Sequence, residues 1–107
     1  MLIAACAGLL GLGLGAVAAT KPGDAAKGKD VFEGTCAACH NADSTEPKVG
    51  PGLKGLFKKA ALANKKKPSD ATVLEIINKG SGGNMPPLAD QLTDQEKVDV
   101  IAYLKTL

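Results

Sequence analysis

The 107-residue sequence contains no arginine, no tryptophan, a single histidine and only three aromatic residues. Arginine is the side chain best suited to bidentate contacts with bases and phosphates. Its absence, with a net charge of only +2, argues against a nucleic-acid partner. Because a domain this short with so few large side chains builds a thin core, its fold needs an additional source of stability.

Cysteine is also scarce, and its three copies are unevenly placed. Cys6 lies in an apolar N-terminal run, so the rest of the chain has only Cys36 and Cys39. A single pair so close together does not build a disulfide framework. Instead, the two cysteines are separated by two residues and followed at once by the only histidine, in the order Cys36-Ala37-Ala38-Cys39-His40.

This spacing is the attachment signature of a c-type haem. On one helical turn, positions i, i+3 and i+4 face the same way, so the thiols of Cys36 and Cys39 and the imidazole of His40 converge. Each thiol can form a thioether with one haem vinyl group, and His40 can then lie under the iron. A buried haem would supply the apolar surface that the thin core lacks, so we expect the domain to fold poorly without it.

Two other kinds of site use a pair of cysteines at this spacing. One is a redox dithiol, which is typical of a βαβ context, and no β-rich run surrounds this pair. The other is half of a zinc site, which needs four ligands, and no further Cys or His follows His40. The sequence therefore favours haem over both.

The N-terminal residues 2–19 are apolar and uncharged, with the sequence LIAACAGLLGLGLGAVAA. Their number is borderline for a membrane span, and Ala16-Val17-Ala18 fits the small-residue motif of a signal-peptide cleavage site. We predict that residues 1–19 are a cleaved signal peptide, with an uncleaved membrane anchor as the alternative, and that residues 20–107 form one domain. The predicted location is the periplasm, with membrane attachment only if the segment is retained.

The remainder of the sequence predicts helices and loops, without a convincing strand. Gly28 stands inside the first predicted helix, where it costs about 1 kcal/mol of helix propensity; either another backbone approaches there, or the glycine is simply tolerated. Four helices are predicted. The first begins at Ala25 after the N-cap Asp24, and the second covers about 54–64. The third covers about 70–79 and ends before Gly80, and the fourth runs from the capping box at 93–96 to about Lys105.

Met85 stands in the Gly- and Pro-rich loop 80–89, GSGGNMPPLA. A methionine is more often core filler than a ligand, but filler is not expected in a polar loop, and the two following prolines stiffen the chain. The only other methionine is Met1, and there is no second histidine to ligate an iron. Met85 is therefore the candidate second axial ligand.

These motifs together resemble a small bacterial class I, monohaem cytochrome c over residues 24–107. The resemblance rests on CAACH at 36–40, VGPGLKGLF at 49–57, NMPP at 84–87 and DVIAYLKTL at 99–107, with Gly28 and Phe32 before the first motif. It implies an all-α fold of three to five helices wrapped around one covalent haem c. It also implies that the N- and C-terminal helices cross near Gly28, Phe32 and Tyr103.

The same resemblance implies a role for each site residue. His40 is the proximal iron ligand, Met85 is the distal one, and the carbonyl of Pro51 binds the free ring nitrogen of His40. Such a bond orients the ring and raises its basicity. The chain departs from larger, mitochondrial-type members in having no Trp for the haem propionates. The implied cofactor residues are Cys36 and Cys39 as covalent attachments and Gly50, Pro51 and Leu53 as pocket residues.

His/Met ligation leaves no open iron position, which disfavours substrate chemistry. We therefore predict a monomeric one-electron carrier, not an enzyme, that shuttles between respiratory or dehydrogenase partners outside the cytoplasm. One alternative is a membrane-tethered haem c subunit of a larger redox complex. A peroxidase-like haem enzyme is less favoured, because the sequence offers no distal histidine.

The positive charge is concentrated in residues 47–69, which hold seven lysines and no acidic residue. The flanking residues 20–46 and 70–107 carry net charges of −2 and −3. The lysines are either a solvated face that maintains solubility or a surface that steers the carrier to a transient, acidic redox partner.

Overall fold

The computed structural model describes residues 20–107, so the predicted signal peptide or anchor at 1–19 lies outside the described residues. Within the described range there is no strand, in agreement with the predicted all-α class. No helix in residues 20–107 has both the length and the apolar character to cross a membrane. The elements are α1 (Ala25–Val31), the π-helical turn η1 (Phe32–Cys36), the 3₁₀ turn η2 (Leu56–Lys58), α2 (Asp70–Lys79) and α3 (Asp94–Leu104).

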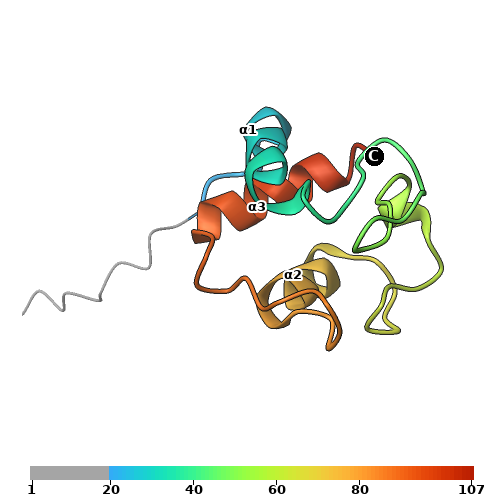
Figure 1. The fold of residues 1–107 in the computed structure, drawn as a ribbon. Helices are drawn as coiled ribbons and strands as arrows, with labels where there is room; N and C mark the ends of the chain where they lie inside the picture. The colour runs from blue at the N-terminus through green and yellow to red at the C-terminus, as the bar shows by residue number, and fades with distance from the viewer. Residues whose placement is uncertain (1–19) are drawn as a thin grey trace, which may run out of the picture.

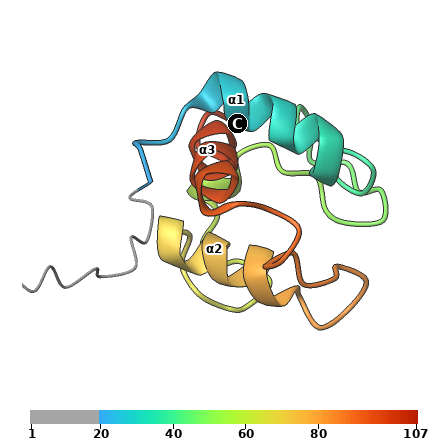
Figure 2. The same cartoon turned by 90° about the vertical axis from the view of Figure 1, so that its left-hand side faces the viewer.

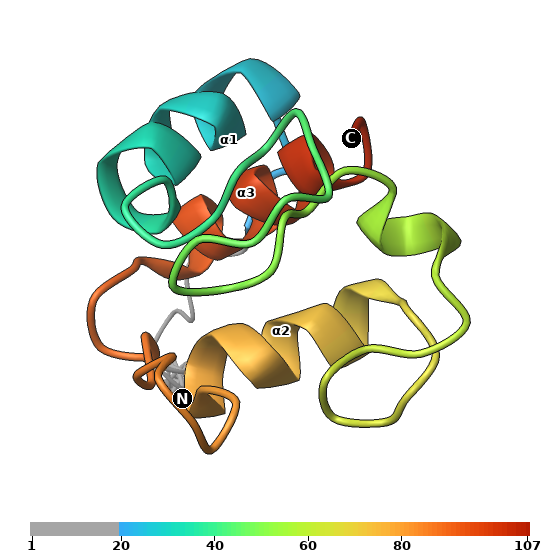
Figure 3. The same ribbon diagram turned by 45° about the vertical axis from the view of Figure 1, so that its right-hand side comes forward.

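Helix α3 lies in the middle of the fold, with α1 across one side of it and α2 on the other (Figures 1 and 2). The long loop between η1 and η2 runs along the open side, between the α1–α3 pair and α2 (Figure 3). This arrangement confirms the predicted contact between the first and last helices.

The crossing of α1 and α3 depends on Gly28. A methyl group at this position would overlap the backbone oxygen of Asp99 and lie 2.9 Å from Cβ of Tyr103. One turn later, Phe32 is 3% exposed and its ring centroid lies 5.5 Å from that of Tyr103. Close backbone approach is therefore the reason for Gly28, and simple tolerance is the wrong explanation.

Two charged residues of α3, Lys97 and Asp99, are buried, which the hydrophobic pattern did not predict. The carboxylate of Asp99 accepts hydrogen bonds from the backbone nitrogen of Asp24 at 2.9 Å and from Nε2 of Gln95 at 3.0 Å. These two bonds satisfy the buried carboxylate. The bond from Asp24 also ties the start of α1 to α3.

The local signals at the helix ends are confirmed. The side chain of Asp24 caps α1, and Ser69 and Thr93 each form a capping box at the start of α2 and α3. Helix α2 ends at Gly80, whose φ of 74° is a conformation that a glycine adopts at little cost.

The predicted helix over about 54–64 is wrong, because only the 3₁₀ turn η2 forms there. Lys59 is extended, and the chain then turns back, with the nitrogen of Leu62 bound to the oxygen of Lys66 at 2.8 Å. This turn provides backbone hydrogen bonds without a helix. It also buries Leu62, and the sequence pattern of this lysine-rich stretch did not predict that burial.

Candidate cofactor site

A cavity of about 410 Å³ opens between the loop after η1, helices α2 and α3, and the loop 80–92. This volume is typical of small-molecule and cofactor sites. Its walls are mainly apolar and include Leu53, Leu56, Leu62, Val73, Ile76, Ile77, Leu88, Leu92, Val100 and Leu104. All seven predicted site residues line this single cavity: Cys36, Cys39, His40, Gly50, Pro51, Leu53 and Met85.

One tight turn carries both thiols and the imidazole. The backbone nitrogens of Cys39 and His40 donate to the oxygen of Cys36 at 3.1 and 3.0 Å. The turn follows η1, where the nitrogen of Ala37 reaches back five residues to Phe32 at 2.9 Å. Because the sequence predicted a helical turn here, the convergence of the three side chains agrees with expectation, whereas the π-helical lead-in was not anticipated.

The Cys36 thiol does not have the lowered pKa of a reactive dithiol. Burial, and next the neighbouring Cys39 sulfur, raises the pKa of the Cys36 thiol to about 11. Reactive dithiols instead have a lowered pKa, since the thiolate is the nucleophile. Within residues 20–107, no group of three or more His, Cys, Asp or Glu side chains is arranged to hold a metal ion directly. The raised pKa of Cys36 therefore gives no support to the redox-dithiol alternative.

His40 is held in one tautomer. Its Nδ1 lies 2.7 Å from the carbonyl oxygen of Pro51. Because a carbonyl can only accept, Nδ1 must donate the proton, which leaves Nε2 with a free lone pair for a ligand. The hydrogen bond implied by the family resemblance is therefore present.

Gly50 is needed for space beside the same ring. A methyl group here would lie 2.9 Å from Nδ1 of His40 and 3.1 Å from Nε2. The nitrogen of Gly50 donates to the oxygen of Cys39 at 2.8 Å, which draws the loop onto the thiol-bearing turn. The sequence placed Gly50 in the pocket, but only the tertiary contact explains why it must be glycine.

Met85 approaches the cavity from another part of the chain. Gly80 allows the loop to fold back, since a methyl group there would overlap the oxygen of Met85 and lie 3.0 Å from the carbonyl carbon of Pro86. The nitrogen of Leu88 then donates to the oxygen of Ile77 at 2.9 Å. These contacts fasten the loop to the end of α2 and leave Met85 half-buried on the cavity wall.

Two further wall residues were not singled out by sequence reasoning. Among residues 20–107, Lys59 is the only lysine or acidic residue on the cavity wall. Val49 is 61% exposed, an unusual exposure for a large hydrophobic side chain in the described part of this chain. Both lie in or just after the stretch VGPGLKGLF, but composition alone does not separate Lys59 from the neighbouring lysines.

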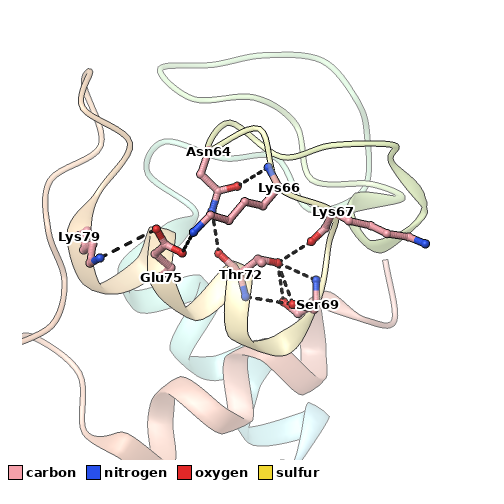
Figure 4. A network of polar contacts seen from close by, with 7 residues as sticks. All are labelled: Asn64, Lys66, Lys67, Ser69, Thr72, Glu75 and Lys79. Atoms are coloured by element: carbon pink, nitrogen blue, oxygen red, sulfur yellow. Dashed lines mark hydrogen bonds and ion pairs between the residues drawn. The ribbon is translucent and has the colours of Figure 1, made fainter.

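The turn that contains Asn64 and Lys66 is bound to α2 by a hydrogen bond and an ion pair (Figure 4). The ammonium of Lys66 lies 2.7 Å from a carboxylate oxygen of Glu75, and Asn64 Nδ2 donates to the oxygen of Thr72 at 3.2 Å. The hydrogen bond from Lys66 lowers the pKa of the Glu75 carboxyl. Lys66 is therefore paired with an acidic residue, so the seven lysines of residues 47–69 are not all free surface charges.

The side chains around the cavity fit a covalently attached haem. Two free thiols and the imidazole come from one turn, a thioether comes from another loop, and the remaining surface is mainly apolar. Within this set, the sulfur and nitrogen donors are those that haem proteins use as attachments and axial ligands.

Comparisons with known proteins agree with this fit. The family model described as cytochrome c matches residues 25–107. The chain is 36% identical over 97 residues to a cytochrome c6 of Synechocystis sp., covering 91% of this chain and 73% of that protein. It is 38% identical over 84 residues to a cytochrome c6 of Diacronema lutheri, covering 77% and 94%. The solved cytochrome c6 of the diatom Phaeodactylum tricornutum superposes with a TM-score of 0.60 at 26% identity, covering 78% of this chain and 93% of that one.

Proposed function

Because this chain belongs to the cytochrome c family and is a c6-like electron carrier rather than an enzyme, we propose that it carries single electrons on a His/Met-ligated haem c. The observation that carries this proposal is the convergence of all seven predicted site residues on one apolar cavity. The hydrogen bond from His40 to Pro51 supports it further, since it prepares Nε2 as a ligand.

Each residue of the cavity then has a task. Cys36 and Cys39 would attach the haem through thioethers, and His40 and Met85 would hold its iron from the two sides of the cavity. The chemistry that the group would supply is a reversible one-electron change at that iron. The apolar walls keep water away from the site. Lys59, the one ammonium that residues 20–107 place on the cavity wall, would be the group to pair with a haem propionate in place of the missing tryptophan.

If His40 and Met85 both bind the iron, no position is left open for a substrate, which is what a carrier needs. The His40 ring is fixed by Gly50 and Pro51, and the Met85 loop is fixed on α2. Ligands held in this way have little room to rearrange, so the site changes its charge with little movement of the protein. A thioether ligand also raises the potential relative to a second imidazole.

The partners are redox proteins that bind transiently outside the cytoplasm, in the periplasm if the leader acts as a signal peptide. The cavity wall includes the exposed Val49 and Lys59, and Lys59 belongs to the run of exposed lysines in residues 54–67. An apolar spot beside positive charge suits an acidic partner that must approach closely but leave quickly. A membrane-tethered relay would use the same surface and differ only in retaining residues 1–19.

Haem staining on a denaturing gel tests the attachment. The double variant Cys36→Ala/Cys39→Ala should lose all covalent haem, whereas Cys6→Ala, which changes the only other thiol, should keep it. A stained band from the double variant would contradict the assignment. The reduced and oxidised optical spectra of the wild type should be c-type, with the weak near-infrared band of Met ligation in the oxidised form.

A further inference from the structure

The loop that holds the His40 ring is itself bound to the turn that carries the two thiols. Its residues Gly50 and Pro51 lie against the ring, and its residue Val49 is exposed on the cavity wall. Since the ring takes its orientation from Gly50 and Pro51, the contacts that fix this loop also decide how His40 faces the cavity.

Backbone hydrogen bonds fix the middle and the end of the loop. Besides the bond from His40 to Pro51, the nitrogens of Gly50 and Leu53 each donate to a carbonyl oxygen of residues 39–41 at 2.8 Å. These bonds lie at and after Gly50, so the start of the loop needs a contact of its own.

A lysine side chain supplies the contact at the start. The ammonium of Lys48 donates to the oxygen of Ala37, inside the attachment turn, at 3.2 Å. The backbone nitrogen of Lys48 donates to the oxygen of Gly50 at 2.9 Å. Lys48 therefore binds the turn that carries the thiols and also the residue that lies against the His40 ring. A charged donor makes this kind of hydrogen bond stronger than a neutral donor would.

This contact sets Lys48 apart from the other lysines of residues 47–69. Within residues 20–107, Lys48 and Lys66 are the two members of this group whose ammonium makes a hydrogen bond. Lys66 is paired with the carboxylate of Glu75, whereas Lys48 makes no ion pair in the same part of the chain. The charge of Lys48 is thus bound to the backbone of the attachment turn and not to an acidic residue.

We propose that Lys48 is a positioning residue for His40, an inference that rests on the proposed function because His40 acts there as an iron ligand. The ammonium holds the start of the loop on Ala37, and the loop then keeps Gly50 and Pro51 against the ring. Because the Lys48 side chain is exposed and its bond is local, losing the bond opens the loop without unfolding the domain.

This role has a consequence for studies of the lysine-rich surface. Lys48 is exposed and directly precedes Val49, so it also contributes to the charge that a partner meets. Replacing Lys48 changes both this charge and the hold on His40, whereas replacing the exposed Lys54 changes the charge alone. The two lysines therefore form a matched pair that separates positioning from surface charge.

Hydrogen exchange of the reduced holo-protein, followed by NMR, tests the proposal on the amide of Gly50 and the Nδ1 proton of His40. In Lys48→Met both protons should exchange about 3- to 10-fold faster than in the wild type, the size expected for the loss of one hydrogen bond. Lys48→Arg keeps a charged donor and should exchange both protons slowly, as the wild type does. Lys54→Met should do the same, because the Lys54 ammonium makes no hydrogen bond within residues 20–107.

Three results would overturn the role of Lys48: equal rates in Lys48→Met and Lys54→Met, a faster Gly50 amide with an unchanged His40 proton, or exchange in Lys48→Arg as fast as in Lys48→Met. The optical spectra keep this test separate from that of the cofactor. A wild type without the spectrum of a His/Met-ligated haem would refute the proposed function. A wild-type spectrum in all four proteins, with equal exchange rates, would refute only the positioning role.

Discussion

The imidazole of His40 is held between two consecutive residues of one loop, Gly50 and Pro51. The carbonyl of Pro51 fixes which nitrogen carries the proton, and the absence of a side chain at Gly50 leaves room for the ring. The orientation in which Nε2 of His40 faces the cavity therefore depends on Gly50 as well as on the hydrogen bond to Pro51.

Gly50→Ala should displace the His40 ring and weaken its hydrogen bond to Pro51, because the added methyl group would lie 2.9 Å from Nδ1. We expect covalent haem to remain, the oxidised spectrum to change, and the free energy of unfolding to fall by about 1–3 kcal/mol. Gly83→Ala is the matched control, since its nearest contact would be the hydroxyl of Ser81 at 3.9 Å. Identical spectra and denaturant midpoints for the two variants would show that the ring is not confined by Gly50.

Met85→Ala should open one axial position of the iron. The potential should fall and small ligands such as cyanide or carbon monoxide should bind more readily, while Cys36, Cys39 and His40 keep the haem in place. Redox titration and ligand-difference spectra measure both effects. Asn84→Ala, in the same loop, should leave the near-infrared band intact. An unchanged potential in Met85→Ala would exclude the thioether as a ligand.

Phe32→Ala should lower the free energy of unfolding by about 3–5 kcal/mol, because the ring is 3% exposed and packs on Tyr103 at the helix crossing. Phe57, which is only partly buried, provides the comparison, and Phe57→Ala should cost less. Denaturant melts of the holo forms measure both. A loss below about 1 kcal/mol at Phe32 is the size expected of a surface site and is incompatible with this packing.

The proposed partner-binding surface is formed by the exposed lysines of residues 54–67, and a charge-reversal test of it should leave Lys66 unchanged, because Lys66 is paired with Glu75. Lys66 is latched to α2, so reversing its charge would disturb the turn as well as the surface field. Lys65→Asp with Lys67→Glu reverses two exposed charges and leaves the Lys66–Glu75 ion pair unchanged. Electron transfer to the natural acceptor should slow at low salt, with the potential nearly unchanged.

The control for this charge reversal is Lys27→Glu with Lys29→Glu on α1, which changes the net charge equally on a helix that contributes no residue to the haem-cavity wall, whereas Lys65 and Lys67 belong to the same lysine-rich stretch as the wall residue Lys59. Wild-type rates should fall as salt shortens the screening length, to about 8 Å at physiological ionic strength. If stopped-flow rates stay flat across the salt series, and both double variants match the wild type, the lysines serve only solubility.

Much of this fold and site could be predicted from local sequence. Asp24, Ser69 and Thr93 cap their helices because a capping side chain bonds to backbone groups two or three residues away. The thiols and imidazole of CAACH converge for the same reason, since they share one turn. Such features need no knowledge of distant contacts.

Only the tertiary structure decided the rest. Gly28 and Gly50 are required because Asp99 and His40, remote in the sequence or across a loop, occupy the space of a side chain. The burial of Lys97 and Asp99, like the replacement of a helix by the turn at Leu62, depends on partners supplied by other segments. A periodic pattern records which face is apolar, but the free energy of burying a charge or of breaking a helix depends on what packs against it.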